Sequence, residues 1–188
     1  VPAIGCTEPL AVALCTARAR ELLGGLPERI EVLLSANILK NAMGVGIPGT
    51  GMIGLPIAVA LGAQIGRSEY GLEVLRDVTP EAVARARDYL AADAVSVALK
   101  EGISETLYVE VHCTAGGRRA EAVIAGSHTR FVYLACDGEV VLDRRTGASS
   151  REEEPCVPLT LRRVFDYALT APIDELAFID EARRLNMA

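Results

Sequence analysis

A cysteine stands directly before the predicted start of the first helix. Thr7 can cap this helix, and Glu8 and Pro9 suit its first turn. Because free backbone N–H groups and the positive dipole end at a helix N-terminus stabilise a thiolate, we expect Cys6 to ionise easily. Cys6 is therefore our first candidate for a nucleophile, a base or a metal ligand. The alternative is a half-buried structural cysteine.

A second group of polar side chains lies between residues 35 and 54, beside several glycines. Its members are Ser35, Asn37, Lys40 and Asn41, followed by a turn at Gly49 and Thr50. Glycines let successive backbone N–H groups converge into an anion-binding concavity. Lysine also tunes its pKa by burial more readily than arginine does. The stretch therefore predicts an anion site, or alternatively a surface loop with a solvated lysine.

Two histidines and a repeated glycine pattern complete the candidates. His128 lies at a predicted turn between strands, where an imidazole could transfer protons near neutral pH, or could simply bond to the backbone. His112 falls on the polar face of a strand, and we expect it to be solvated.

The pattern G-x-G-x-x-G starts at Gly44 and again at Gly49. It does not follow a strand directly, as a dinucleotide-binding turn must, so a nucleotide-binding oxidoreductase module is the weaker hypothesis.

The elements that would position these residues follow an α+β pattern. We expect helices near residues 7–23, 55–65, 80–100, 160–169 and 173–185, and strands near 29–34, 106–113, 118–126, 130–135 and 139–142. Gly24 should end the first helix, Thr79 should open the third, and Asp137-Gly138 should form a hairpin turn between the last two strands. The chain then divides into a helical and glycine-rich region 1–105, antiparallel strands 106–143, a linker 144–158 and helices 159–188. We expect a small antiparallel sheet of about four to five strands, with helices on one face.

Composition excludes several classes of function. The 188 residues carry a formal charge of −6, with eight aromatic residues and no tryptophan, which argues against a nucleic-acid surface. No apolar run is long enough to span a membrane, and no signal peptide is evident, so we expect a cytoplasmic protein. Five cysteines without a C-x-x-C pair favour neither a disulfide scaffold nor zinc. Most of these thiols, Cys15 among them, should pack in the core.

Several segments closely resemble the L-cysteine desulfidase family, within the iron–sulfur L-serine dehydratase alpha-chain superfamily. They are residues 1–9 (VPAIGCTEP), 35–42 (SANILKNA) and 47–51 (IPGTG), and the likeness continues through 71–75, 127–129 and the last helix. The resemblance implies α,β-elimination of L-cysteine to pyruvate, ammonia and sulfide, or of L-serine to pyruvate and ammonia, at a [4Fe–4S] cluster. It further implies an amino-terminal part of a longer protein, without the C-terminal helical portion of the family.

The resemblance also implies roles for single residues. Cys6 matches one of three characteristic cysteines and would bind the cluster, although a role as base stays open. The other two belong to the C-terminal portion, and Cys113, Cys136 and Cys156 do not match them, so this chain alone would hold no complete cluster and would be inactive. Lys40, Asn41 and His128 would act with Cys6 in ligation or proton transfer, and the substrate carboxylate would bind at Ser35, Asn37, Gly49 and Thr50.

We accordingly expect a small amino-acid substrate and, as partner, the missing C-terminal portion or a separate subunit. The protein could also form a homo-oligomer. Neither nucleic acid nor a membrane is an expected partner. A non-catalytic regulatory or partner-binding α+β domain is the remaining alternative to the enzyme, by analogy of fold alone.

Overall fold

The computed structural model describes residues 3–145 and 160–187. The chain divides into two compact units after Gly147. The first unit contains a six-stranded sheet and its helices, and the second contains two short helices. Cys156 and most of the expected linker lie outside the described residues.

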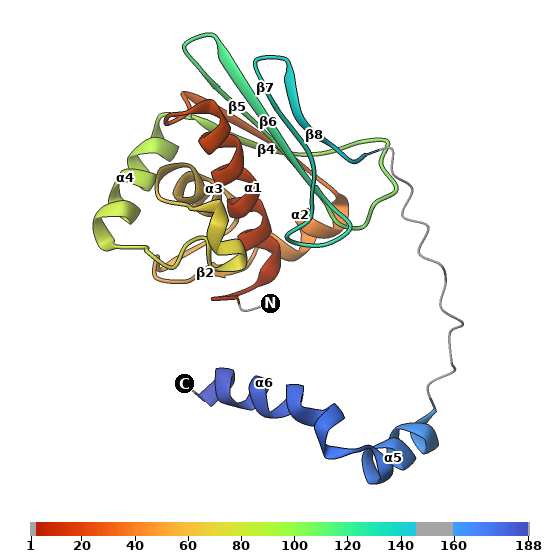
Figure 1. Ribbon diagram of the computed structural model, residues 1–188. Helices are drawn as coiled ribbons and strands as arrows, with labels where there is room; N and C mark the ends of the chain where they lie inside the picture. Colours follow the sequence, from red (N-terminus) through yellow and green to blue (C-terminus); the bar gives the residue numbers. More distant parts are fainter. Residues whose placement is uncertain (1–2, 146–159, 188) are drawn as a thin grey trace. The chain divides into compact units, whose positions relative to one another are not determined.

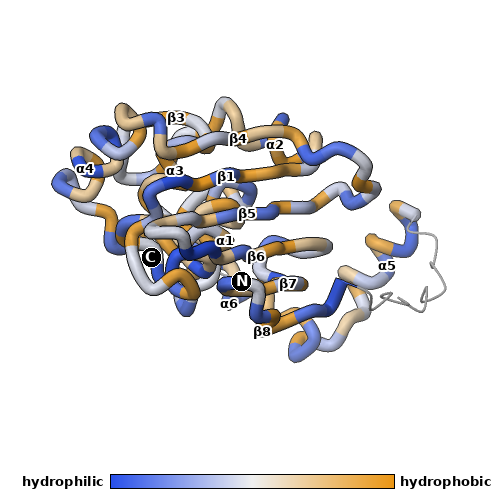
Figure 2. Tube along the Cα trace, turned by 90° about the horizontal axis from the view of Figure 1, so that it is seen from above, coloured by the Kyte–Doolittle hydropathy of each residue, from blue (hydrophilic) through white to orange (hydrophobic). Residues whose placement is uncertain are grey.

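The sheet confirms the α+β class but is larger than expected and mixed. Its strands are β1 (Arg29–Leu34), β4 (Val95–Leu99), β5 (Tyr108–Ala115), β6 (Arg118–Ala125), β7 (Phe131–Cys136) and β8 (Glu139–Asp143). They lie side by side in the order β4-β1-β5-β6-β7-β8 (Figure 2). β1 and β4 run parallel, and the other neighbouring pairs run antiparallel. The predicted hairpin at Asp137 and Gly138 is confirmed between β7 and β8.

The helices of the first unit lie on one side of this sheet (Figure 1). The main ones are α1 (Thr7–Leu23), α3 (Leu55–Gln64) and α4 (Pro80–Ala91). Gly24, in the left-handed conformation at φ 81°, ends α1 as predicted. Thr79 caps α4, because its side chain accepts a hydrogen bond from the Ala82 N–H at 3.2 Å. A 3₁₀ segment, η1 (Ser68–Glu73), follows α3.

The glycine-rich stretch is more ordered than the predicted loop. It contains a short helix, α2 (Ala36–Ala42), and a two-stranded antiparallel hairpin of β2 (Gly46–Ile47) and β3 (Met52–Ile53). The doubled glycine pattern therefore lies within and around this hairpin. It does not form the strand-to-helix turn of a parallel nucleotide-binding unit.

The helix predicted over 80–100 is wrong in its second half. It ends at Ala91, and Asp93 turns the chain with φ 54°. Residues 95–99 then form β4, in which Val95 and Val97 pair with Ile30 and Val32 of β1. β-Branched residues fit a paired strand better than a helix, and pairing with β1 completes this edge of the sheet.

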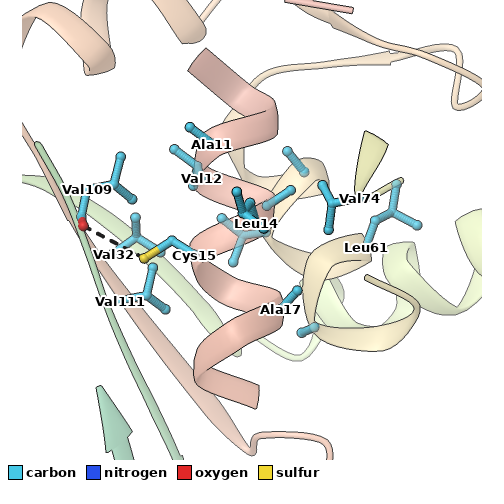
Figure 3. Close-up of a cluster of buried hydrophobic side chains, with 14 of the residues drawn as sticks. Ala11, Val12, Leu14, Cys15, Ala17, Val32, Leu61, Val74, Val109 and Val111 are labelled. Carbon is cyan, nitrogen blue, oxygen red and sulfur yellow. Dashed lines mark hydrogen bonds between the residues drawn. The ribbon is translucent and has the colours of Figure 1, made fainter. Parts of the chain in front are cut away.

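The core lies between α1, the sheet and α3 (Figure 3). Leu14 is 1% exposed and Cys15 is fully buried, as predicted for this cysteine. The Cys15 thiol donates to Ala122 O at 3.3 Å and points at Val109 O of β5. On the other side of α1, a Cβ built on Gly62 would lie 2.5 Å from Ala13 O. Glycine at this position therefore lets α3 approach α1 closely.

The second unit confirms both predicted C-terminal helices. It consists of α5 (Leu161–Thr170), the 3₁₀ segment η2 (Ile173–Leu176) and α6 (Ala177–Met187). Thr160 caps α5 by accepting from the Arg163 N–H at 3.3 Å. None of the residues in these three elements is buried. In the described ranges 3–145 and 160–187, no helix has both the length and the apolar character that crossing a bilayer requires.

Candidate functional site

Several of the expected site residues lie at one end of the sheet, where β1 ends and β5 begins. The Ser35 N–H, just after β1, donates to Tyr108 O at 3.0 Å. At the same end, the Gly126 N–H donates to Leu107 O at 3.1 Å. The β6–β7 turn, which carries His128, therefore lies at the end of the sheet where α2 begins.

The first helix begins at this end too. Its last turn lies at the opposite end, where Arg118, beside the β5–β6 turn, donates to Leu23 O at 2.7 Å. Cys6, which precedes α1, is thus at the end that carries the β1–α2 junction. The loop before α1 also touches the β2–β3 hairpin, because a Cβ built on Gly5 would lie 2.8 Å from Pro48 Cγ.

A thiol–carboxylate pair forms at the start of α1. The Cys6 thiol donates to Glu8 Oε2 at 3.0 Å, and the Thr7 hydroxyl donates to the same oxygen at 3.2 Å. Asn41, from α2, donates its amide N–H to Glu8 Oε1 at 3.4 Å. Both carboxylate oxygens are therefore held, and Cys6 is half-buried.

The pair is protonated on sulfur. Burial, followed by the hydrogen bond to Glu8, raises the pKa of Cys6, and this outweighs the lowering by the backbone N–H groups of Glu8 and Thr7. The hydrogen bond from Cys6 lowers the pKa of Glu8 in turn. The expectation that Cys6 ionises easily is therefore wrong. Partial burial and the neighbouring Glu8 carboxylate raise the pKa of Cys6 by more than the helix N-terminus lowers it.

Two of the expected substrate-binding residues hold the fold together. The Ser35 hydroxyl donates to Thr106 O at 2.9 Å, and Ser35 is 3% exposed. The Thr50 hydroxyl donates to Ile47 O at 2.7 Å within the β2–β3 hairpin, and Thr50 is 7% exposed. Both hydroxyls are engaged with backbone carbonyls, so binding a substrate would require breaking these bonds.

The remaining expected site residues stand apart from the thiol–carboxylate pair. Asn37 and Lys40 are exposed on α2, and His128 is half-buried in its turn. Within residues 3–145, no hydrogen bond or ion pair joins these three side chains to Cys6 or Glu8. Gly49 is exposed and has φ 74°, which favours glycine. The structure thus brings Asn41, but not Lys40, into contact with the pair.

The described cysteines do not fit a [4Fe–4S] cluster by themselves. Such a cluster takes several thiolate ligands at one place. Cys15 and Cys113 are buried in the core, and burial raises the pKa of each thiol. Cys136 donates to Leu22 O at 3.3 Å, at the opposite end of α1 from Cys6. At the end of α1 where Cys6 lies, the described part of the chain therefore offers a single thiol, that of Cys6.

Sequence reasoning missed a polar cluster on the sheet face opposite α1. We call Lys100, Tyr108, Glu110, His112, Arg119 and Glu121 the open-face cluster. His112, expected to be solvated, is only 7% exposed, and its Nε2 lies 2.7 Å from Glu110 Oε1. Lys100 Nζ is 2.8 Å from Glu110 Oε2. Burial alone would raise the pKa of Glu110, but hydrogen bonds from His112, Lys100 and Tyr108 lower it to about 2.

The open-face cluster contains a possible metal-ligand set that is already neutralised. Ligand atoms of Glu110, His112 and Glu121 all lie within 4.8 Å of one another. However, Arg119 Nη2 lies 2.9 Å from His112 Nδ1, and Lys100 pairs with Glu110. Lys100 and Arg119 already balance the charges of Glu110 and Glu121. We therefore interpret the cluster as a structural network. The alternation of polar residues in β5 indicates one face of a strand, but only the pairing of His112 with Glu121 reveals the cluster.

Comparison with known proteins gives relatives along the whole chain. The chain is 63% identical, over 100% of its length, to a UPF0597 protein of Bacteroides thetaiotaomicron. It is 59% identical to a UPF0597 protein of Phocaeicola vulgatus and 44% identical to one of Aeromonas hydrophila, again over 100% of its length. It spans only 43–44% of the length of these relatives. No family model matches the chain, and no solved structure matches it.

These relatives correct the expected family. Proteins that match the chain from end to end are named UPF0597 proteins, and not L-cysteine desulfidases or L-serine dehydratases. The assignment to the L-cysteine desulfidase family is therefore wrong.

Proposed function

We propose that this chain supplies part of the active site of a lyase that acts on a small β-substituted amino acid, such as L-cysteine or L-serine. The observation that supports the proposal best is the pair of Cys6 and Glu8, with 3.0 Å between sulfur and oxygen. It offers a protonated thiol and an ionised carboxylate side by side. An elimination requires a proton acceptor and a proton donor in that arrangement.

The two groups can complete a balanced proton cycle. The Glu8 carboxylate accepts the proton from the substrate Cα, and the bond from Cβ to sulfur or oxygen breaks. The Cys6 thiol donates its proton to the departing group, which leaves as hydrogen sulfide or water. Glu8 then returns its proton to the Cys6 thiolate across their hydrogen bond. The remaining 2-aminoacrylate rearranges to an imine, and water hydrolyses it to pyruvate and ammonia.

Glu8 alone is a weak base, since its pKa is lowered. Removal of a Cα proton therefore needs additional stabilisation of the carbanion. The expected [4Fe–4S] cluster does not fit the described thiols, so we derive no step through it. Lys40 and Asn37 are the exposed polar side chains of α2 that could bind the substrate carboxylate. Both are within one turn of Asn41, which contacts Glu8.

The site requires more of the protein than this chain. The curated relatives are more than twice as long as the matched segment. Further groups that activate the substrate belong, in this proposal, to the rest of the longer protein or to a partner subunit. We also propose a cytoplasmic location, because Cys6, Cys15, Cys113 and Cys136 are all free thiols.

The test uses the full-length protein, purified anaerobically and supplied with L-cysteine or L-serine. We expect sulfide and pyruvate from L-cysteine, or pyruvate from L-serine. Cys6→Ala and Glu8→Gln should each lower the rate by about 100-fold or more. Cys136→Ala, at the opposite end of α1, is the matched control and should keep full activity. The proposal fails if neither amino acid is consumed, or if the Cys6 and Glu8 variants remain fully active.

A further inference from the structure

A cavity lies at the end of α1 that is remote from Cys6. It has a volume of about 670 Å³ and is formed by the last turn of α1, the end of α3 and one face of α4. Small-molecule sites commonly measure about 300–1,000 Å³. The cavity is therefore large enough for a metabolite, and it shares no lining residue with the thiol–carboxylate pair.

Two residues of its lining carry buried polar atoms without partners. Within the described ranges, Arg20 Nε and Gln64 Oε1 are the side-chain nitrogen and oxygen atoms that are buried and make no hydrogen bond. Arg20 is fixed from its other side, because Nη2 donates to Gly66 O. The guanidinium can only donate and the amide oxygen can only accept. Buried polar groups are normally paired, so the protein leaves one donor and one acceptor unsatisfied in two side chains of this wall.

The rest of the lining has opposite charges beside an apolar surface. Arg85 and Asp88, both exposed on α4, make no ion pair in the part of the chain that the structure describes. Leu26 and Ala63 supply aliphatic surface. The Tyr89 hydroxyl donates to Pro27 O at 2.6 Å, and its ring, which is half-buried and packs partly against the core, also belongs to the lining.

We propose that this cavity binds a free α-amino acid with an apolar side chain. The ligand carboxylate faces Arg85 and the guanidinium of Arg20, while its ammonium group faces Asp88 and the side chain of Gln64. The side chain lies against Leu26, Ala63 and the Tyr89 ring. This arrangement places each charged group of the ligand beside lining residues of complementary character. The site is independent of the proposed elimination, because it lies at the other end of α1.

L-Leucine is the probe for the first test, with the full-length protein and a thermal-shift or calorimetric readout. We expect a rise in melting temperature of a few degrees at about 100 times the dissociation constant. Isoamylamine and isocaproate, which lack the carboxylate and the amine respectively, should give no rise. The proposal is overturned if L-leucine, L-isoleucine and L-phenylalanine all fail to bind, or if isoamylamine or isocaproate binds as well as L-leucine.

Gln64→Leu separates a binding role from a structural one. Replacing an unsatisfied buried acceptor by an apolar group should leave the unliganded protein as stable as before or more so, while abolishing the response to L-leucine. Arg85→Ala, on the exposed face of α4, is the second variant and should weaken binding without harming the fold. Arg87→Ala, also exposed on α4 but outside the cavity, is its control. Unchanged L-leucine binding in both Gln64→Leu and Arg85→Ala would refute the proposal.

Discussion

At the scale of single residues, the site depends on which atom of the thiol–carboxylate pair holds the proton. Burial and Glu8 keep the proton on Cys6, although the sulfur precedes a helix N-terminus. The general rule that helix N-termini activate thiols thus fails here for a local reason. A carboxylate 3.0 Å away acts more strongly than the backbone N–H groups.

Glu8→Gln should therefore lower the pKa of Cys6, because it removes the negative charge that disfavours the thiolate. The measurement is the rate of Cys6 alkylation by iodoacetamide as a function of pH, followed by mass spectrometry. We expect the midpoint to move to lower pH. Glu31→Gln, at an exposed position on β1, should leave it unchanged. A midpoint that stays in place would show that Glu8 does not control the thiol.

Glu110 of the open-face cluster should make stability depend on pH. Its pKa is lowered from 4.5 to about 2 in the folded protein. The cluster therefore stabilises the fold fully above about pH 4.5, and this contribution is lost as the pH falls toward 2. Urea unfolding at several pH values should show a smaller decrease in this window for Glu110→Gln than for the unmodified protein. Equal decreases would contradict the assignment.

At the scale of elements, α1 connects the two ends of the first unit. Its start carries the thiol–carboxylate pair, its middle is buried against β5, β6 and α3, and its end forms the amino-acid cavity. The packing against α3 depends on the small residues Ala13 and Gly62, because larger side chains at these positions would push the two helices apart. The position of α1 is therefore set by close helix contact as well as by apolar burial.

Gly62→Ala tests this contact. Alanine favours a helix over glycine by about 1 kcal/mol, so an unpacked helix would gain stability. Here the new Cβ would lie 2.5 Å from Ala13 O, and we expect a net loss of about 2 kcal/mol or more. Chemical denaturation measures the change. Gly25→Ala, which meets no atom within 4 Å, is the control and should be close to neutral. A stabilised Gly62→Ala variant would rule out close α1–α3 packing.

At the scale of the whole molecule, the second unit does not bury its own apolar side chains. Apolar side chains are widely exposed along it, and the most exposed are Leu161 at 91%, Ile173 at 84% and Met187 at 76%. Helices of 10 and 11 residues are marginal in water without tertiary packing. The relatives provide more than half of their length outside the matched segment. We therefore expect these helices to pack against that remaining part.

Hydrogen exchange in residues 160–187 checks this expectation. In the full-length protein these amides should be protected by about 100-fold or more relative to the isolated 188-residue chain. Phe165→Asp and Ile179→Asp, both at exposed apolar positions, should remove the protection. Glu181→Asp, at an exposed polar position, is the control. Rapid exchange in both proteins would exclude such packing, and protection that depends on protein concentration would instead indicate a second copy.

Several features of this fold can be predicted from short segments of the sequence. The cap at Thr79, the stop at Gly24 and the turn at Asp137 and Gly138 each depend on neighbouring residues, and each prediction is confirmed. The small apolar residues of α1 likewise indicate a buried helix, and Cys15 is buried as predicted. These features depend on hydrogen bonds and hydrophobic periodicity within one short segment, which the sequence displays directly.

Tertiary structure alone decided the rest. Pairing with β1 converted residues 95–99 from an expected helix to a strand. Glu8, Asn41 and Cys6 meet because α1 and α2 pack together, and the register of β5 with β6 buries His112 against Glu110 and Glu121. The amino-acid cavity joins three helices that are distant in the chain. Such contacts depend on how faces and registers combine in space, and the pattern of a single segment does not contain that information.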